Sequence, residues 1–264
     1  MVAANEAVAA YHVEKALPLA ARVHPSPDEE RFDDFRALLK AVEIPFRGKP
    51  EPRALQCLVE KVKDDPLSAV VQLALLRTMG HAEYTSTRSL HFALATSTYC
   101  HFTSPIRRYP DLLMHQILDD FFDGKMASGL HTKKWAERLA EWLPQASELE
   151  RRAEEAEREM IRLRLIRYLQ SRVGEEMTGR VSFVHPFGFF VRIEESLIEG
   201  LVHVSSLRDD YYEYDREGCR LVARRKKRDF AVGDLVRVVL SDVDPDQREI
   251  SFRVLKKLQG RERS

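Results

Sequence analysis

Residues 179–207 read GRVSFVHPFGFFVRIEESLIEGLVHVSSL, and this stretch carries the clearest structural pattern in the chain. Short runs rich in β-branched and aromatic residues alternate with turn residues, which is typical of strands in a small sheet. The pattern continues in LVRVVLSDV at 235–243 and REISFRVL at 248–255. We therefore predict an all-β barrel of about five strands over residues 173–258, followed by a basic tail at 259–264.

The phenylalanines of this stretch are too closely spaced to all face inward on a small barrel. Side chains alternate between the two faces of a strand, so Phe187 and Phe190 share a face only if Gly188 permits a bend or bulge. We expect these two rings outside, where each stacked base would contribute ~1–3 kcal/mol. Phe183 and Phe189 are expected in the core. The alternative is that the outer rings belong to the core as well.

Residues 1–172 instead carry the start and stop signals of helices. Helices are expected over these ranges: 3–20, 28–42, 51–63, 65–80, 103–123, 131–143 and 147–172. Together with the barrel, this pattern predicts an α+β fold whose first part is mainly helical.

Two of the expected helices have further features. The helix at 103–123 should carry Arg107, Arg108 and Tyr109 in its first turn, with a kink or restart at Pro110. The last helix has one apolar seam at alternating spacings of four and three residues. The seam is formed by Leu149, Ala153, Ala156, Met160 and Leu163.

The chain has 42 basic and 42 acidic residues, so its formal net charge at pH 7 is zero. Any affinity for nucleic acid must therefore come from local clusters of charge. In RLVARRKKR, residues 220–228, six of nine residues are basic. Such a run is usually a solvated loop, but this one lies within the predicted barrel. We expect phosphate contacts from Arg224, Arg225, Lys226 and Lys227.

The three cysteines, Cys57, Cys100 and Cys219, have no metal or disulfide spacing. They favour free thiols in a reducing compartment, so the cytoplasm is the expected location. The longest apolar runs fall far short of a bilayer span, and no contact with a membrane is expected. The N-terminal residues lack the basic lead and apolar core of a signal peptide.

The barrel segment, roughly residues 174–255, resembles the RNA-binding OB-fold domain first named from the ribosomal protein S-one. The resemblance lies in a Gly-x-Val opening strand, a Phe-Gly-x-Phe-Val turn, the string EGLVHVS at 199–205, and the stretch 244–248 followed by Ile-Ser. It implies stacking by His203 beside the two outer phenylalanines. It also implies that Arg248 contacts phosphate and that Asp244 orients Arg248 or accepts a hydrogen bond from a base.

The string YCHFTSPIRRYPDLLMH, residues 99–115, resembles the signature of ribonuclease R and ribonuclease II exoribonucleases. Residues 22–24, 76–79 and 91–94 match that family as well. A capped helix start offers free N–H groups to a phosphate, and arginine adds forked donors. The resemblance implies that Arg107 holds the scissile phosphate, with Arg108 and Tyr109 beside the RNA.

The roles of these residues have alternatives. The arginines could belong to a surface helix start and pair with Asp119 or Asp120. Tyr109 and Asp111 are also expected to brace the turn. Glu157 aligns with a family glutamate near the catalytic centre, but from its pattern alone it is a solvated helical acid.

Family members use two magnesium ions held by clustered aspartates. Nothing in this chain resembles that cluster, so we expect no metal ligand here; Asp28, Asp33 and Asp34 should lie on the outer face of a helix. The resemblance thus covers the C-terminal part of the nuclease domain (1–172) and the barrel (173–258). The chain could be a truncated product, a subunit whose partner chain supplies the aspartates, or an isolated fragment.

The leading hypothesis is a role in 3′-to-5′ exonucleolytic degradation of single-stranded RNA to nucleoside 5′-monophosphates. A second hypothesis is an RNA-binding protein without catalysis. A third is an adaptor that docks on ribosomes through the basic residues near its end, which are Lys256, Lys257, Arg261 and Arg263. If the helical part lacks its packing partner, it should expose a large apolar patch and tend to aggregate or dimerise.

Overall fold

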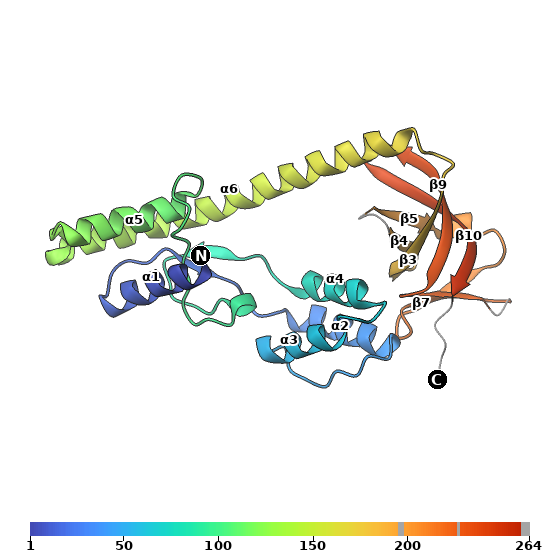
Figure 1. Cartoon of the computed structure of the whole chain (residues 1–264), viewed down its shortest axis with the longest axis horizontal. Coiled ribbons are helices and arrows are strands. Elements are labelled where there is room, and N and C mark those ends of the chain that lie inside the picture. The colour runs from blue at the N-terminus through green and yellow to red at the C-terminus, as the bar shows by residue number, and fades with distance from the viewer. Residues whose placement is uncertain (195–197, 226–227, 260–264) are drawn as a thin grey trace. The chain divides into compact units, whose positions relative to one another are not determined.

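The computed structural model describes residues 1–194, 198–225 and 228–259. Figure 1 shows helices in the first part of the chain and a closed barrel in the last part, which confirms the predicted α+β class. The chain divides into two compact units. The first unit comprises Met1–Asp28, Gly48–Cys57 and Arg77–Glu155, and the second comprises Glu29–Arg47, Leu58–Leu76 and the residues from Ala156 onward.

Helices and one small sheet make up the first unit. Its elements are α1 (Val2–Glu14), β1 (Ala21–Val23), β2 (Glu83–Thr85), the 3-10 helix η1 (Phe92–Leu94), α5 (Tyr109–Phe122), η2 (Lys125–Ala127) and the start of α6 (Gly129–Gln170). The sheet, in which β1 and β2 run antiparallel, was not predicted. A buried cluster holds α1, α5 and α6 together, and it includes Ala9, Leu113, Met114, Ile117, Leu139 and Leu143. Apolar burial of this kind is the main force that stabilises the unit.

The predicted helix at 3–20 is too long, because α1 ends at Glu14. Lys15 caps it through its backbone N–H, and Ala16 takes a left-handed backbone with φ of 52°. Pro18 follows and has no N–H with which to continue the helix. The chain then turns into β1.

One continuous helix replaces the two that were predicted at 131–143 and 147–172. Pro144 lies inside α6 and is exposed, so its ring meets solvent rather than the core. On the opposite face, Leu139 and Leu143 are fully buried, and Ser147 Oγ accepts from the backbone N–H of Tyr84 at 2.9 Å. These contacts on both sides of Pro144 outweigh the free-energy cost of a proline inside a helix. The predicted apolar seam stays outside the core, since Leu149 and Met160 are exposed.

The second unit contains α2 (Glu29–Ala41) and parts of α3 (Pro52–Lys61) and α4 (Ser68–Thr78). Acidic side chains in the first turn of α2 complement the positive end of the helix dipole. The predicted amphipathic pattern is confirmed, because the apolar side chains of α2 are buried and its aspartates, Asp33 and Asp34, are exposed, as is Asp28 just before the helix. The buried residues are Phe32, Phe35, Leu38 and Leu39.

A five-stranded barrel follows, as predicted. Its strands are β3 (Glu176–His185), β4 (Gly188–Ile193), β5 (Glu199–His203), β9 (Leu235–Asp244) and β10 (Glu249–Gln259). They close in the order β10-β5-β4-β3-β9, with a parallel pairing only between β10 and β5. Val181, Phe189, Val191, Val202 and Val236 are fully buried inside. Closure removes the exposed strand edges.

An unpredicted three-stranded sheet lies between β5 and β9 in the sequence. After the 3-10 helix η3 (Val204–Ser206), the strands β6 (Tyr212–Asp215), β7 (Arg220–Ala223) and β8 (Asp229–Ala231) pair antiparallel. Phe230 of β8 stacks on the buried Phe189 with ring centroids 4.8 Å apart, so this sheet shares the barrel core. The basic run expected as a loop therefore begins in a strand.

In the part of the chain that the structure describes, no helix is long and apolar enough to cross a lipid bilayer.

We expect Gly188→Ala to destabilise the barrel by about 3 kcal/mol, because this position combines a special backbone with a backbone clash. Gly188 has φ of +153°, and an added Cβ would lie 2.2 Å from the carbonyl oxygen of Val202. Urea unfolding checks this. Gly129→Ala is the matched control, since a Cβ there meets nothing within 4 Å. Equal stability of the two variants would show that β4 and β5 separate more easily than this packing indicates.

Candidate functional site

Aromatic side chains gather on the outer surface of the barrel where β3 turns into β4. The ring centroids of His185 and Phe187 are 4.9 Å apart and stacked, and those of Phe187 and Phe190 are 6.4 Å apart edge to face. Phe187 lies in the turn and is 44% exposed. The structure thus brings Phe187 and Phe190 together on the outside, as the sequence predicted. We call His185, Phe187, Phe190 and the neighbouring Phe183 the aromatic platform.

The prediction that Phe183 belongs to the core is wrong. A register shift between Val181 and Phe183 interrupts the β3–β4 ladder, and Val181 and Ser182 are both buried. This bulge reverses the alternation of side chains, so Phe183 faces outward and Val184 faces inward. Phe183 then contacts His185 with ring centroids 4.7 Å apart.

His185 was missed by the sequence analysis, although it sits among the other platform rings. It contacts Phe183, Phe187 and, at 6.3 Å between centroids, Phe190. Its spacing of two from Phe183 would have placed it on the same face once the bulge was known. In the ladder it pairs with Gly188, which pairs on its other side with His203.

His203 is exposed at the end of β5. Its Nδ1 accepts from the backbone N–H of Ser205 at 3.2 Å and lies 2.7 Å from the hydroxyl of the same residue. Because Nδ1 accepts from a backbone N–H, the proton of the neutral ring is on Nε2, which remains a donor. The ring is therefore held in one orientation on β5, beside β4, the strand that carries Phe190.

Asp244 and Arg248 lie at the two ends of the β9–β10 turn. Asp244 Oδ1 accepts from the backbone N–H groups of Asp246 and Gln247 at 2.8 and 2.9 Å. Asp244 thus orients the turn that carries Arg248. The Arg248 guanidinium forms an ion pair with Glu159 of α6, within the second unit. A phosphate that binds Arg248 would have to compete with that carboxylate.

The basic run is only partly engaged in ion pairs. Arg224 and Arg225 are exposed, and the Arg224 side chain lies 3.9 Å from Glu213. Arg225 is anchored through its backbone N–H, which donates to Asp210 Oδ2 at 2.8 Å. Lys226 and Lys227 lie outside the described residues.

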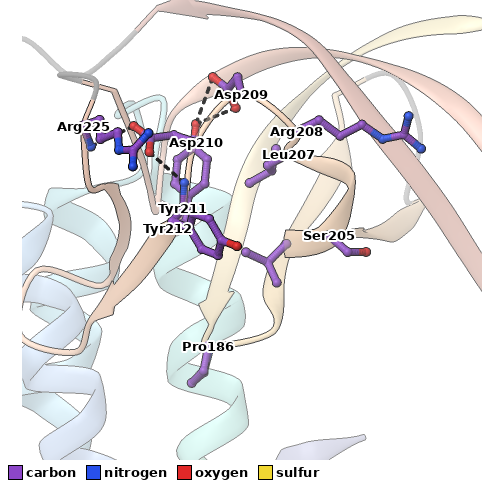
Figure 2. Close-up of a pocket in the computed structure, with 10 residues that line it drawn as sticks. Pro186, Ser205, Leu207, Arg208, Asp209, Asp210, Tyr211, Tyr212 and Arg225 are labelled. Carbon is purple, nitrogen blue, oxygen red and sulfur yellow. Dashed lines mark hydrogen bonds between the residues drawn. The ribbon is translucent and has the colours of Figure 1, made fainter.

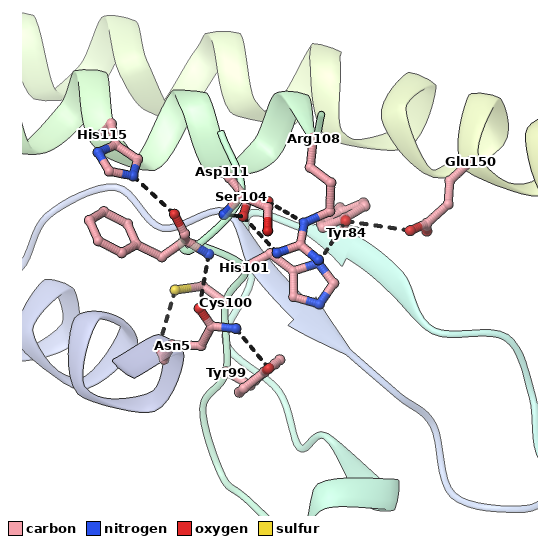
Figure 3. Close-up of polar contacts among 11 residues, drawn as sticks. Asn5, Tyr84, Tyr99, Cys100, His101, Ser104, Arg108, Asp111, His115 and Glu150 are labelled. Carbon is pink, nitrogen blue, oxygen red and sulfur yellow. Dashed lines mark hydrogen bonds and ion pairs between the residues drawn. The ribbon is translucent and has the colours of Figure 1, made fainter. Parts of the chain in front are cut away.

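In the first unit, the residues before α5 form a turn that a buried carboxylate holds. Asp111 is fully buried and accepts from the backbone N–H of Ser104 and from Nε and an Nη of Arg108, each at 2.8 Å (Figure 3). Asp111 therefore braces this turn, as predicted. Arg107 is exposed, and among the described residues it has no ion pair.

The prediction that the arginines lie in the first helical turn is wrong, because α5 begins at Tyr109 and Arg108 has an extended backbone. Pro110 occupies an early position of α5, where a missing N–H costs nothing. Tyr109 is 48% exposed and lies near Trp142 with ring centroids 6.0 Å apart. Asp120 pairs with Lys125 and His131, and Arg108 pairs with Asp111. Among the described residues, neither Asp119 nor Asp120 forms an ion pair with Arg107 or Arg108, so that alternative is not observed.

A network of polar side chains around Tyr84 supports the segment that leads to this turn. Tyr84 Oη lies 2.8 Å from His101 Nδ1 and donates to Glu150 at 3.5 Å (Figure 3). The Arg22 guanidinium pairs with Glu150 and lies 4.4 Å above the Tyr84 ring. The side-chain amide of Asn5 donates to Tyr99 Oη at 2.8 Å. The sequence alone did not indicate this network, because its members are far apart in the chain.

Three buried or half-buried histidines accompany the network. Burial, helped by His24 and Arg22, lowers the pKa of His91 to about 4. Burial, helped by Arg108 and Arg22, lowers the pKa of His101 to about 4 as well. Burial also lowers the pKa of His24, whose ring centroid is 5.4 Å from that of His91. These rings are neutral at pH 7 and add no positive charge beside Arg22 and Arg108.

Glu157 lies on α6 in the second unit and is exposed. Its neighbour two residues on, Glu159, is the partner of Arg248. The structure thus places Glu157 as a solvated acid, and its catalytic role remains a prediction.

Two family descriptions match the chain: the RNB domain over residues 1–124 and the S1 RNA binding domain over residues 170–255. The chain is 37% identical to ribonuclease R of Aquifex aeolicus and 38% identical to ribonuclease R of Escherichia coli, in each case over 264 aligned positions. This chain resembles the C-terminal portion of ribonuclease R, with part of an RNB domain and an S1 domain. The alignments include 99% and 97% of this chain but only 37% and 32% of the two relatives, so it spans about a third of their length.

Solved structures of the ribonuclease R family agree with this assignment. Ribonuclease R of Mycoplasma genitalium in its apo form is 26% identical, with a TM-score of 0.89 over 97% of this chain and 40% of that one. The same values hold for that enzyme in complex with ribose-methylated single-stranded RNA. Yeast Ssd1, a pseudonuclease, is 23% identical with a TM-score of 0.61, over 83% of this chain and 28% of that one; it shares the fold.

Ribonucleases with an RNB domain are typically metal-dependent. Among the described residues of this chain, no group of three or more histidine, cysteine, aspartate or glutamate side chains could hold a metal ion. The residues present therefore do not fit a catalytic metal by themselves.

We expect the stability of the first unit to fall as the pH falls from about 6.5 to about 4, the interval between the ordinary pKa of a histidine side chain and the pKa of His91. In this interval His91 is protonated in the unfolded chain but neutral in the native protein, so a fall in pH favours unfolding. Above pH 6.5 His91 is neutral in both states, and its contribution to the free energy of unfolding is constant. Thermal unfolding at several pH values measures the slope. His91→Gln should make it shallower but not flat, since His101 and His24 still contribute, whereas His81→Gln, at an exposed position, should leave it unchanged. Identical slopes for both variants would contradict the role of His91.

Proposed function

We propose that this chain grips single-stranded RNA with its barrel and supplies Arg107 to the scissile phosphate in a 3′-to-5′ exoribonuclease. The observation that carries the proposal is the exposed aromatic platform on a barrel whose family binds RNA. Bases stack on such rings whatever their sequence, as a processive enzyme requires. The products would be nucleoside 5′-monophosphates.

Five barrel residues are proposed to touch the RNA. Phe187, Phe190 and His203 would stack on bases, Arg248 would bind a phosphate, and Asp244 would orient Arg248 or accept a hydrogen bond from a base. Arg224, Arg225, Lys226 and Lys227 are proposed to add phosphate contacts along the same strand.

In the helical part, Arg107 supports the catalytic proposal best. It is exposed and, among the described residues, has no ion pair, while its neighbour Arg108 is locked to Asp111. An arginine held at the end of a braced turn can stabilise the charge that develops on phosphorus oxygens during hydrolysis. Arg108 and Tyr109 would line the path of the RNA, and Glu157 would adjust the grip on it.

The described residues do not offer a ligand set for a catalytic metal, so the proposal needs ligands from elsewhere. We propose that the ions are magnesium and that their carboxylate ligands come from another part of the enzyme, in the same polypeptide or in a second chain. The chain's own residues would then bind and orient the RNA, with a working division into a nuclease part (1–172), a barrel (173–258) and a tail (259–264). Cytoplasm remains the proposed location, since all three cysteines are free.

A second candidate is RNA binding without catalysis. The observation that favours it is the lack, among the described residues, of any side-chain group that could hold a metal. The adaptor hypothesis loses one of its residues, because Lys257 is engaged by Asp229 and Asp234 at 3.1 and 2.6 Å.

One experiment separates exonucleolytic degradation from RNA binding without catalysis. Binding and cleavage of 5′-labelled single-stranded RNA are measured side by side in the presence of magnesium. Phe187→Ala should weaken binding by about 1–3 kcal/mol, since one stacked base is lost. Arg107→Ala should lower any cleavage far more than it weakens binding, since only one phosphate contact is lost. Tyr168→Ala, an exposed ring on α6, is the control.

The outcomes of this experiment are distinct. Binding without cleavage supports RNA grip with metal ligands located elsewhere. Cleavage from the 3′ end that EDTA abolishes would mean that the chain holds a metal by itself. Binding that Phe187→Ala leaves intact would exclude the platform as the RNA-binding surface.

Glu159→Gln should tighten RNA binding roughly two- to five-fold, because removing the charge releases Arg248 for phosphate and a half-exposed pair is worth ~0.2–1 kcal/mol. The binding measurement with 5′-labelled single-stranded RNA checks it. Glu155→Gln, an exposed acid on the same helix, controls for the change in net charge. Unchanged or weaker binding by Glu159→Gln alone would argue that Arg248 takes no part in RNA binding.

A further inference from the structure

A cavity of about 690 Å³ lies beside the aromatic platform, within the second unit. Its walls come from the β3–β4 turn, from η3 and the loop after it, from the start of β6, and from Arg225 in the segment after β7 (Figure 2). The lining includes Pro186, Ser205, Asp209, Asp210, Tyr211 and Arg225. Of the described residues proposed above to touch RNA, only Arg225 lines it. Its volume is in the range of sites that enclose small ligands.

The cavity shares its edge with the proposed RNA path. Pro186 directly precedes Phe187 in the β3–β4 turn. Ser205, also in the lining, is the residue that fixes the His203 ring through Nδ1. An RNA strand stacked over Phe187 and His203 therefore has the mouth of this cavity next to it.

The side chains of the cavity suit a nucleobase better than a phosphate. Tyr211 is 81% exposed, so its ring is available for stacking at the rim. Asp209 and Asp210 offset the charges of Arg208 and Arg225 in the lining, so the cavity is not a positively charged phosphate site. Figure 2 shows the Arg208 side chain extending away from these two aspartates, where it can meet the backbone of a bound strand.

The carboxylates are held in place by the protein. Asp209 accepts from Tyr212 Oη at 3.1 Å and from an Nη of Arg228 at 3.1 Å. Asp210 accepts from the backbone N–H groups of Tyr211 and Arg225 at 2.7 and 2.8 Å. Among the described residues, Asp209 Oδ1 accepts one hydrogen bond, and a carboxylate oxygen can accept two. A fixed carboxylate of this kind can accept from N–H groups on the edge of a base.

We propose that this cavity is a base-selective subsite that takes a guanine of the bound RNA, with its ring on Tyr211 and its Watson–Crick edge toward Asp209. Guanine presents a ring N–H and an adjacent amino group, and a carboxylate can accept from both. Uracil presents one N–H between two carbonyl oxygens, which a carboxylate repels. The proposal rests on the proposed RNA-binding function and adds a preference to it.

Fluorescence anisotropy with the full chain in EDTA, which suppresses metal-dependent cleavage, tests the subsite. The probes are a uridine decamer and the same decamer with one central guanosine or one central inosine, which lacks the amino group. We expect the guanosine to tighten binding at least five-fold and the inosine to recover only part of that gain. Tyr211→Ala and Asp209→Asn should abolish the preference and leave affinity for the uridine decamer unchanged. Tyr168→Ala should keep both.

Each outcome addresses one proposal. If neither decamer binds, or if Phe187→Ala changes nothing, the proposed function fails and the subsite fails with it. If the uridine decamer binds through Phe187 but guanosine adds nothing, only the subsite is overturned. The same holds if Tyr211→Ala retains the preference. Because Tyr211 is largely exposed, its loss should not unfold the barrel, so a negative result has a direct meaning.

Discussion

The backbone contact between β4 and β5 at Gly188 is the constraint on which the candidate RNA surface depends. A Cβ at Gly188 would lie 2.2 Å from the Val202 carbonyl oxygen, so only glycine allows this approach. It sets Phe187 and Phe190 on one side of the hairpin and brings His203 into register beside them. The platform and the cavity next to it both follow from that approach.

A buried carboxylate plays the corresponding part in the helical unit. Asp111 has no exposed surface, and an uncompensated charge there would be very costly. Its hydrogen bonds to Ser104 and Arg108 compensate it and fix the turn before α5. Arg107 lies in the same turn but donates no hydrogen bond to Asp111. One arginine is thus structural, and its neighbour remains available for an anion.

Local patterns in the sequence predicted what local physics determines, such as the buried face of α2, the five barrel strands and the exposure of Phe187. The failures occurred where tertiary contacts override a local signal. Packing at Leu143 and Ser147 carries α6 through Pro144, and a bulge at Phe183 reverses the faces of β3. The sheet of β6–β8 was missed because its strands are short and because it packs into the barrel core through Phe230 rather than forming a core of its own.

The charge balance of the chain favours stacking over charge as the main part of the proposed grip on RNA. Many arginines are already paired within the protein, as Arg108 is with Asp111, Arg228 with Asp209 and Arg248 with Glu159. A phosphate can recruit such an arginine only by displacing its carboxylate, which reduces the net gain. Stacking on exposed rings carries no such penalty. The proposed grip on RNA is therefore better served by aromatic rings than by added positive charge, since rings hold bases without binding each phosphate in turn.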